Sequence, residues 1–225
     1  MNKENEFKDA NDYDNTGQSA LQKGDFAKAL EFFTKSRQIF SKLGDKENEA
    51  FQLANIAHCY LNAAMPDKAL EAYKISFDLL KSVENRFGQA MVLNNLGHLY
   101  VSLKEFDNAL SSFQRALEIY DALGENREKG LQLQNIGSVH RDRAENKNAL
   151  FAYFDALAIF EKIGCKLDSA NQFANIGYIY AVDRKINKAL QWFKKALVLY
   201  KELNEKERAD SVKQNIENLS RYQDT

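Results

Sequence analysis

The chain has 225 residues and a mass of 25.8 kDa, which suits one large domain or a small array of repeats. Hydrophobic residues make up 44% and charged residues 28%, a composition that excludes a disordered chain. The formal net charge of −1 disfavours a nucleic-acid-binding protein, and the single proline favours an all-helical fold.

The N-terminus is charged from its first residues, so we expect no secretory signal. No apolar stretch approaches the roughly 18 residues that a membrane span requires. The cysteines, Cys59 and Cys165, are too few to staple a chain of this size and are typical of reduced thiols. We therefore expect a cytoplasmic protein that does not insert into a membrane.

The sequence repeats at a constant interval, without insertion or deletion. An Ala-Leu pair recurs at 29–30, 69–70, 109–110, 149–150 and 189–190, and an aromatic residue follows each of these alanines by four positions. Asparagine recurs in a second column, and a small residue follows each of the first five by two positions. The asparagine column consists of Asn15, Asn55, Asn95, Asn135, Asn175 and Asn215.

Each unit is expected to hold two helices, because apolar residues recur in it with a period near 3.6. In chain order, the expected elements are an N-terminal extension, five two-helix repeats, and a capping helix with a tail, in which Ala209, Val212, Ile216, Leu219 and Tyr222 form the apolar face. The ranges are 1–10 for the extension, 11–44, 51–84, 91–124, 131–164 and 171–204 for the repeats, and 205–225 for the cap and tail. We expect the first repeat to present a wetter face, in part through Ser36 and Arg37.

Glycines occupy two kinds of position in these units. Gly44, Gly124 and Gly164 follow the last apolar residue of a second helix, which predicts a left-handed C-cap, and Asn204 takes the same place in the fifth unit. Glu84 departs from this pattern and predicts a differently built turn. The other column, at 17, 97, 137 and 177, lies inside the first helices and predicts that two helices approach too closely for a side chain.

These columns resemble the tetratricopeptide repeat. The third unit carries the family signature through Leu93, Leu96, Gly97, Tyr100, Ala109, Phe113 and Ala116. The long repeat unit, with asparagine ahead of an Ile-Gly pair, is similar to the repeats of kinesin light chains, Pins-type spindle adaptors and Rap-type bacterial peptide receptors. The resemblance implies an all-α, right-handed α-solenoid of five helix–turn–helix repeats plus a C-terminal capping helix.

No motif for catalysis, phosphate binding or a metal site occurs in the sequence. His58 and His98 share one phase of neighbouring repeats, so their rings are expected to lie near one another, but a third and fourth zinc ligand are missing. His140 replaces the signature tyrosine and is expected to pack with a satisfied ring nitrogen. We expect a protein that is not an enzyme and that takes no cofactor or metal.

The resemblance implies that the first helices line a concave groove, which binds a peptide segment of a partner protein. The candidate groove residues are mostly amides and histidines: Asn15, Gln18, Asn55, His58, Asn62, Asn94, Asn95, His98, Gln134, Asn135, Ser138, Arg141, Asn175 and Tyr178. An amide side chain both donates and accepts, so a row of amides can pair with a peptide backbone. Two alternatives stay open: the asparagines bond neighbouring helices and contact no ligand, or the groove senses a peptide signal or a small molecule.

A second candidate surface comes from a break in the repeat. Phe151 and Phe154 stand where the sister helices carry mostly polar residues, and Trp192 of the next unit is expected to border them. An exposed aromatic patch usually marks an interaction site. This patch predicts a convex interface, with a homodimer as its simplest use and a self-assembling scaffold as the alternative function.

Overall fold

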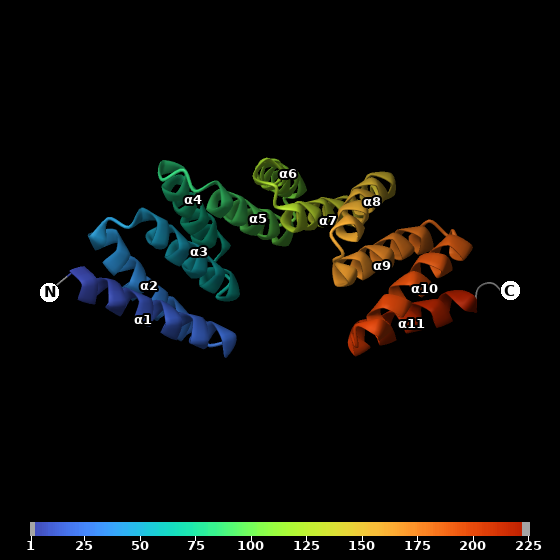
Figure 1. Cartoon of the computed structure of the whole chain (residues 1–225), viewed down its shortest axis with the longest axis horizontal. Helices are drawn as coiled ribbons and strands as arrows, with labels where there is room; N and C mark the ends of the chain where they lie inside the picture. Colours follow the sequence, from blue (N-terminus) through green and yellow to red (C-terminus); the bar gives the residue numbers. More distant parts are fainter. Residues whose placement is uncertain (1–2, 222–225) are drawn as a thin grey trace. The chain divides into compact units, whose positions relative to one another are not determined.

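A computed structural model describes residues 3–221, and this part of the chain is entirely helices and short turns (Figure 1). The helices follow one another as five hairpins and a last single helix, as the repeat predicted. Their bounds are α1 Lys3–Gln22, α2 Phe26–Leu43, α3 Lys46–Asn62, α4 Pro66–Ser82, α5 Arg86–Ser102, α6 Phe106–Leu123, α7 Asn126–Asp142, α8 Asn146–Lys162, α9 Lys166–Val182, α10 Ile186–Glu202 and α11 Lys206–Ser220.

The helix boundaries extend the expected ranges. Residues 3–10 of the predicted extension belong to α1, and residues 46–50, between the first two expected repeats, form the start of α3. The predicted capping helix is α11, although Tyr222 of its expected apolar face lies outside the described residues. Among the helices of residues 3–221, none combines the length and apolarity of a membrane-crossing segment.

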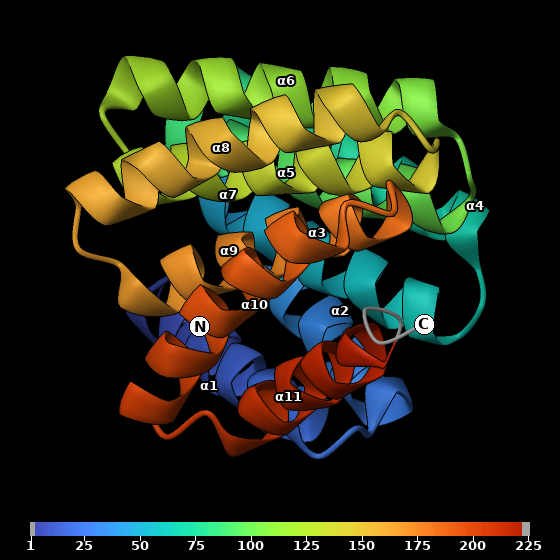
Figure 2. The same ribbon diagram turned by 90° about the vertical axis from the view of Figure 1, so that its right-hand side faces the viewer.

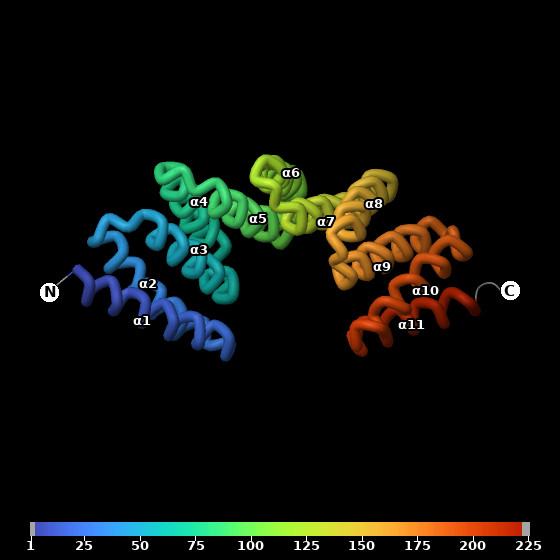
Figure 3. The backbone as a smooth tube through the Cα atoms, viewed as in Figure 1, coloured from blue at the N-terminus to red at the C-terminus, as the bar shows by residue number. Residues whose placement is uncertain are grey.

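The chain divides into two compact units, Met1–Ile119 and Tyr120–Thr225, and the division falls within α6. In the first unit each helix from α1 to α5 packs against the next, and α3 also contacts α5. In the second unit α7 to α11 pack in the same sequential way. Figures 2 and 3 show the short connections between consecutive helices.

One residue of each connection adopts a left-handed backbone. After the second helices it is Gly44, Gly124 and Gly164, with φ of +72 to +75°, and also Asn204, with φ of +58°. The expectation of a different turn at Glu84 was wrong, because its φ of +57° gives the same conformation. The neighbouring hydrogen bond from Asn85 N to Leu80 O matches the one from Asp45 N to Phe40 O, so the turn geometry dominates over the preference for glycine.

The glycines inside the first helices lie against the aromatic column, as predicted. A Cβ on Gly97 would lie 2.4 Å from Cε1 of Phe113, and one on Gly17 would lie 2.6 Å from Cε1 of Phe33. Phe33 and Phe113 are almost fully buried, so neither ring is free to move aside. The two helices of each of these hairpins therefore need the missing side chain to reach their packing distance.

Each unit has its own apolar core on the facing sides of its helices. In the first, Leu53, Tyr73, Leu80 and Val92 belong to one buried cluster. In the second, Tyr153, Ile176 and Phe193 lie at the centre of a larger cluster that extends to Val212 of α11. The capping helix thus buries one face against α10, which is how a terminal helix closes a repeat array.

Buried serines fasten the first two hairpins. Ser36 Oγ donates to the Ala10 carbonyl at 2.9 Å, and Ser76 Oγ donates to the Ala50 carbonyl at 2.7 Å. Both side chains are fully buried. Ser36 therefore does not belong to the wetter face that we expected for the first repeat, because its hydroxyl has a buried acceptor within the hairpin.

Candidate functional site

The asparagine column lies along the first helix of each repeat, at an intermediate depth. Asn55, Asn95, Asn135 and Asn175 are half-buried, whereas Asn15 and Asn215 are exposed. A half-buried amide keeps part of its donor and acceptor capacity at the surface while its stem packs on the helix. The column is therefore neither sealed in the core nor fully solvated in the middle repeats.

Two successive asparagines of the column meet in a pocket of the first unit. Asn55 of α3 and Asn95 of α5 line a cavity of about 350 Å³ together with His58 and His98. The prediction that these two histidines lie near one another is consistent with this shared cavity. The rest of this histidine pocket is apolar or aromatic and consists of Phe51, Ala54, Leu61, Tyr73 and Met91.

Ring contacts hold both histidines in place at the rim of the histidine pocket. The His98 ring meets the Phe113 ring edge-on, with 5.1 Å between the centroids, and the His58 ring lies 6.4 Å from that of Phe26. Desolvation by these surroundings lowers the pKa of His98 from its ordinary value. Burial therefore makes the His98 ring harder to protonate, and the histidine pocket places two imidazole rings and two amides beside apolar walls.

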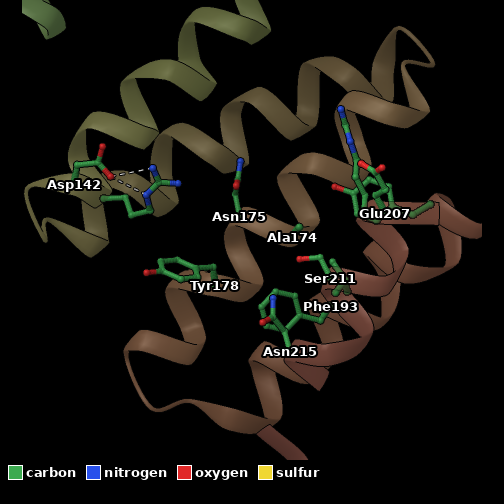
Figure 4. A pocket seen from close by; sticks show the side chains of 12 residues that line it. Asp142, Ala174, Asn175, Tyr178, Phe193, Glu207, Ser211 and Asn215 are labelled. Atoms are coloured by element: carbon green, nitrogen blue, oxygen red, sulfur yellow. Dashed lines mark hydrogen bonds and ion pairs between the residues drawn. The ribbon is translucent and has the colours of Figure 1, made fainter. Parts of the chain in front are cut away.

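A second pocket, in the other unit, repeats this arrangement with different side chains. Asn175 of α9 and Asn215 of α11, again successive members of the column, line a cavity of about 610 Å³, and Tyr178 points into it from α9 (Figure 4). Its charged residues are Arg141 and Asp142 on one side and Glu207 and Arg208 on the other. We call it the C-terminal pocket, and its remaining lining residues are Ala174, Phe193, Tyr200, Ser211 and Val212.

The two arginines of the C-terminal pocket are held by partners within the protein. Arg141 Nε donates to the adjacent Asp142 at 3.0 Å, and Arg208 Nη1 donates to Asn171 Oδ1 at 2.8 Å. Tyr200 OH donates to the same Asn171 oxygen at 2.8 Å. Because each guanidinium is already oriented by a partner, the pocket presents fixed charges of both signs around its amides.

The hydrogen bonds of three asparagines bear on the alternative that the column links neighbouring helices. Asn95 Oδ1 accepts from the adjacent Asn94 at 3.4 Å, and Asn175 Nδ2 donates to Gln172 Oε1 of its own helix at 3.4 Å. Asn62, which is exposed, donates to the His58 carbonyl one turn back at 3.0 Å. Each of these three contacts lies within one helix, although Gln172, the partner of Asn175, is itself bonded to Gln134 of α7.

The remaining predicted residues divide into internal contacts and surface positions. Gln18 is half-buried and donates weakly to Asp14 at 3.5 Å, and Ser138 Oγ lies 3.2 Å from Tyr153 OH. Gln134 accepts from Gln172 at 2.5 Å, which joins α7 to α9. His140 Nδ1 lies 2.6 Å from Glu145 Oε2, so its ring nitrogen is satisfied, as expected.

Sequence reasoning missed a buried glutamine column three positions before the asparagines. Gln52, Gln132 and Gln172 are 0–3% exposed, and Gln172 connects Asn175 to Gln134. The pattern was visible in the sequence, because glutamine recurs there in phase with the repeat, but glutamine is a common solvent-face residue and its burial was not expected. One polar link between repeats, from Gln172 of α9 to Gln134 of α7, therefore runs through this column.

The aromatic patch on α8 is only partly open. Phe151 is 71% exposed, whereas Phe154 and Trp192 are half-buried and meet edge-on, with 5.5 Å between their ring centroids. Trp192 also lies 5.6 Å from the Phe173 ring and carries the Lys195 ammonium 4.2 Å above its own ring centroid. The expectation that Trp192 borders the patch is confirmed, and Phe151 is its exposed member.

The family follows from comparison with known proteins. A tetratricopeptide repeat family model matches residues 11–82 and 88–162, which is more than half of the chain. The chain belongs to the tetratricopeptide repeat family. Such repeats typically form protein-interaction modules. No curated protein matches the sequence.

Solved structures share the fold at low sequence identity. BtubC (BKLC) from P. vanneervenii is 21% identical, with a TM-score of 0.76, over 84% of this chain and 78% of that one. The apo form of RapI is 18% identical, with a TM-score of 0.81, over 95% and 82% of the two chains. Kinesin-light-chain-like repeats from Podospora anserina are 11% identical, with a TM-score of 0.72, over 87% and 96%. The expected likeness to kinesin light chain and Rap-type arrays is confirmed at the level of the fold.

Proposed function

We propose that this tetratricopeptide repeat protein is a non-catalytic adaptor that binds a peptide segment of a partner protein along its first helices. One observation carries the proposal. In each unit, two successive asparagines of the column line the same pocket, Asn55 with Asn95 and Asn175 with Asn215. A peptide backbone is a repeating chain of hydrogen-bond donors and acceptors. A cavity lined by paired amides, each of which donates and accepts, therefore suits a peptide ligand.

The two pockets favour different side chains of such a peptide. The histidine pocket combines amides with Phe51, Tyr73 and Met91, so it suits an apolar side chain next to the bound backbone. The C-terminal pocket carries two arginines and two carboxylates, so it suits a polar segment that complements both signs. A net hydrogen bond contributes about 0.5–1.5 kcal/mol, and several of them less the ordering cost predict micromolar affinity.

The test starts from a displayed library of random 12-residue peptides selected on the wild-type protein. The affinities of the enriched peptides are then measured by fluorescence anisotropy against two double variants, Asn55→Ala with Asn95→Ala and Asn175→Ala with Asn215→Ala. Two hydrogen bonds lost per asparagine, at the low end of their range, amount to about 2 kcal/mol, or about a thirtyfold rise in Kd for each pocket.

The matched control changes two exposed asparagines that lie outside both pockets, Asn108→Ala with Asn148→Ala. Each of these amides donates only to a nearby glutamate, Asn108 to Glu105 and Asn148 to Glu145. The control should leave the affinity within twofold. Enriched peptides that bind all three double variants equally would contradict the proposal, and so would a selection that enriches no peptide.

A further inference from the structure

The second unit has another pocket besides the C-terminal pocket. It is formed by α8, α9 and α10, away from the asparagine column, and we call it the α8–α10 pocket. Its volume is about 640 Å³, and Phe160, Phe173, Val198 and Leu199 form its apolar wall. Its charged lining residues are Glu161, Lys166 and Lys195. None of the sequence patterns that define the repeat requires such a cavity, because its lining positions differ from their counterparts in the first unit.

The corresponding place two repeats earlier also holds a cavity, and its lining is more polar. There Arg86, Arg115 and Ile119 line a cavity of about 510 Å³ that also holds Glu84 and Gln89. Gln89 reaches across to donate to the Leu80 carbonyl at 3.4 Å, whereas its counterpart Ser169 is short and donates to Cys165 of its own helix at 3.1 Å.

Two further lining residues differ between the two places. Gly164 replaces Glu84, which removes one acidic side chain, and Glu161 replaces Lys81, while Val198 adds an apolar side chain to the wall of the α8–α10 pocket. Val198 is 56% exposed. The α8–α10 pocket is therefore larger and more apolar than the cavity at the corresponding place two repeats earlier.

The same surface also carries the side chain that would fill this pocket. Phe151 of α8 is 71% exposed, one turn before Phe154, and a run of contacts leads from Phe154 through Trp192 to Lys195 at the pocket edge. The sister helices have Glu31, Glu71, Ser111 and Gln191 at the position of Phe151. An apolar knob and an apolar hole on one face form a self-complementary surface, which a two-fold axis can satisfy twice.

The charges of this face are self-complementary as well. The Lys195 ammonium lies over the rings of Trp192 and Phe173, and within residues 3–221 no carboxylate pairs with it. Asp155 is exposed one turn after Phe151 and carries a negative charge. The equivalent positions of the other repeats carry Lys35, Ile75, Arg115 and Lys195, which are basic or apolar. An acid next to the knob and a base next to the hole are the arrangement that two copies need.

We propose that two copies of this chain form a homodimer in which Phe151 of each enters the α8–α10 pocket of the other. Phe151 lies in the second turn of α8, and the pocket lies at the C-terminal end of the same helix, about 13 Å further along its axis. An antiparallel pairing of the two α8 helices therefore brings each knob to the far end of the other helix, where the pocket lies. The two-fold axis of the dimer then passes near Asp155, and the Asp155 and Lys195 side chains of the two copies alternate around this axis.

The experiment measures the molar mass of the full chain by sedimentation equilibrium from 5 to 500 µM. The wild type should reach twice 25.8 kDa, and Phe151→Glu, which restores the residue of Glu31 and Glu71, should weaken the dimer at least tenfold. Ser169→Gln, which introduces the side chain of Gln89, should do the same by placing a longer polar group in the pocket. Ser111→Glu makes the same kind of change at the equivalent exposed position and should leave the mass unchanged.

A charge exchange distinguishes this pairing from other contacts. Asp155→Lys and Lys195→Asp should each weaken the dimer at least threefold, and the double variant should regain most of the loss. Circular dichroism at 222 nm verifies that each variant is folded, and the exposed Phe151→Glu and Asp155→Lys keep the test decisive if a pocket variant fails to fold. A wild type that stays at 25.8 kDa at 500 µM would overturn the proposal, as would a Phe151→Glu dimer of wild-type affinity.

Discussion

The glycine inside the first helix of a hairpin is the most direct test of how the hairpins pack, and Gly97→Ala is the sharpest case. In an exposed helix, this substitution would stabilise the protein by about 1 kcal/mol, because alanine is the better helix former. Here the new Cβ would lie 2.4 Å from Cε1, 2.6 Å from Cδ1 and 2.7 Å from Cζ of Phe113.

Three ring atoms inside van der Waals contact leave two outcomes, a displaced Phe113 ring or a wider gap between α5 and α6. Phe113 is 1% exposed and has no solvent-filled space to enter. Overpacking of this kind costs about 1–3 kcal/mol beyond what the helix gains, so we expect Gly97→Ala to lower the free energy of unfolding by about 2 kcal/mol.

The assay is urea unfolding followed by circular dichroism at 222 nm, with Ala57→Gly as the matched control. Ala57 is the one alanine among these column positions of the five repeats and is fully buried, so its change to glycine should cost about 1 kcal/mol of helix propensity and about 1 kcal/mol for the lost methyl group. A Gly97→Ala protein that is more stable than the wild type would refute the close-approach explanation.

Three further outcomes follow from individual side chains. Gln52 Oε1 is buried without a hydrogen-bond partner, so Gln52→Met should raise the free energy of unfolding by about 1 kcal/mol in the same urea assay, and a loss would contradict it. The pKa of His98 is lower in the folded protein, so the unfolded chain binds the proton more readily. The contribution of His98 to the free energy of unfolding is therefore complete above about pH 6.5 and declines as the pH falls toward the folded pKa. A His98 pKa at or above about 6.5 by NMR titration would contradict this direction. Burial raises the pKa of Cys59 to about 11, so a maleimide reagent at pH 7 should label the half-buried Cys165 and leave Cys59 unlabelled in the native protein, whereas equal labelling would show that Cys59 is accessible.

The repeat made the helices and their turns predictable from the sequence, because a constant repeat length reproduces every packing constraint in each unit. Gly17 and Gly97 were predicted to lie at close approaches, and they do. Glu84 was misjudged, because glycine only lowers the cost of a left-handed backbone, and the hydrogen bonds of a fixed turn can impose it on other residues.

The candidate site was less predictable, because it depends on how deeply each column sits. The pairing of Asn55 with Asn95 and of His58 with His98 in one cavity followed from their phase. The contribution of α11 through Glu207 and Arg208 did not, because that helix was considered only as a cap. The α8–α10 pocket was also missed, because its apolar lining comes from several separate substitutions, such as Ser169 for Gln89 and Gly164 for Glu84, at positions that look unremarkable in the sequence.

The central claim is that the paired asparagines of the two pockets contact a bound peptide. The most direct measurement follows the side-chain amide resonances of Asn55, Asn95, Asn175 and Asn215 by ¹⁵N NMR while a library-selected 12-residue peptide is added. We predict saturable shifts at one or both of the two pairs, at the same peptide concentration that saturates the anisotropy, and none at Asn108 or Asn148. Saturable binding that leaves all four pocket amides unshifted would contradict the claim.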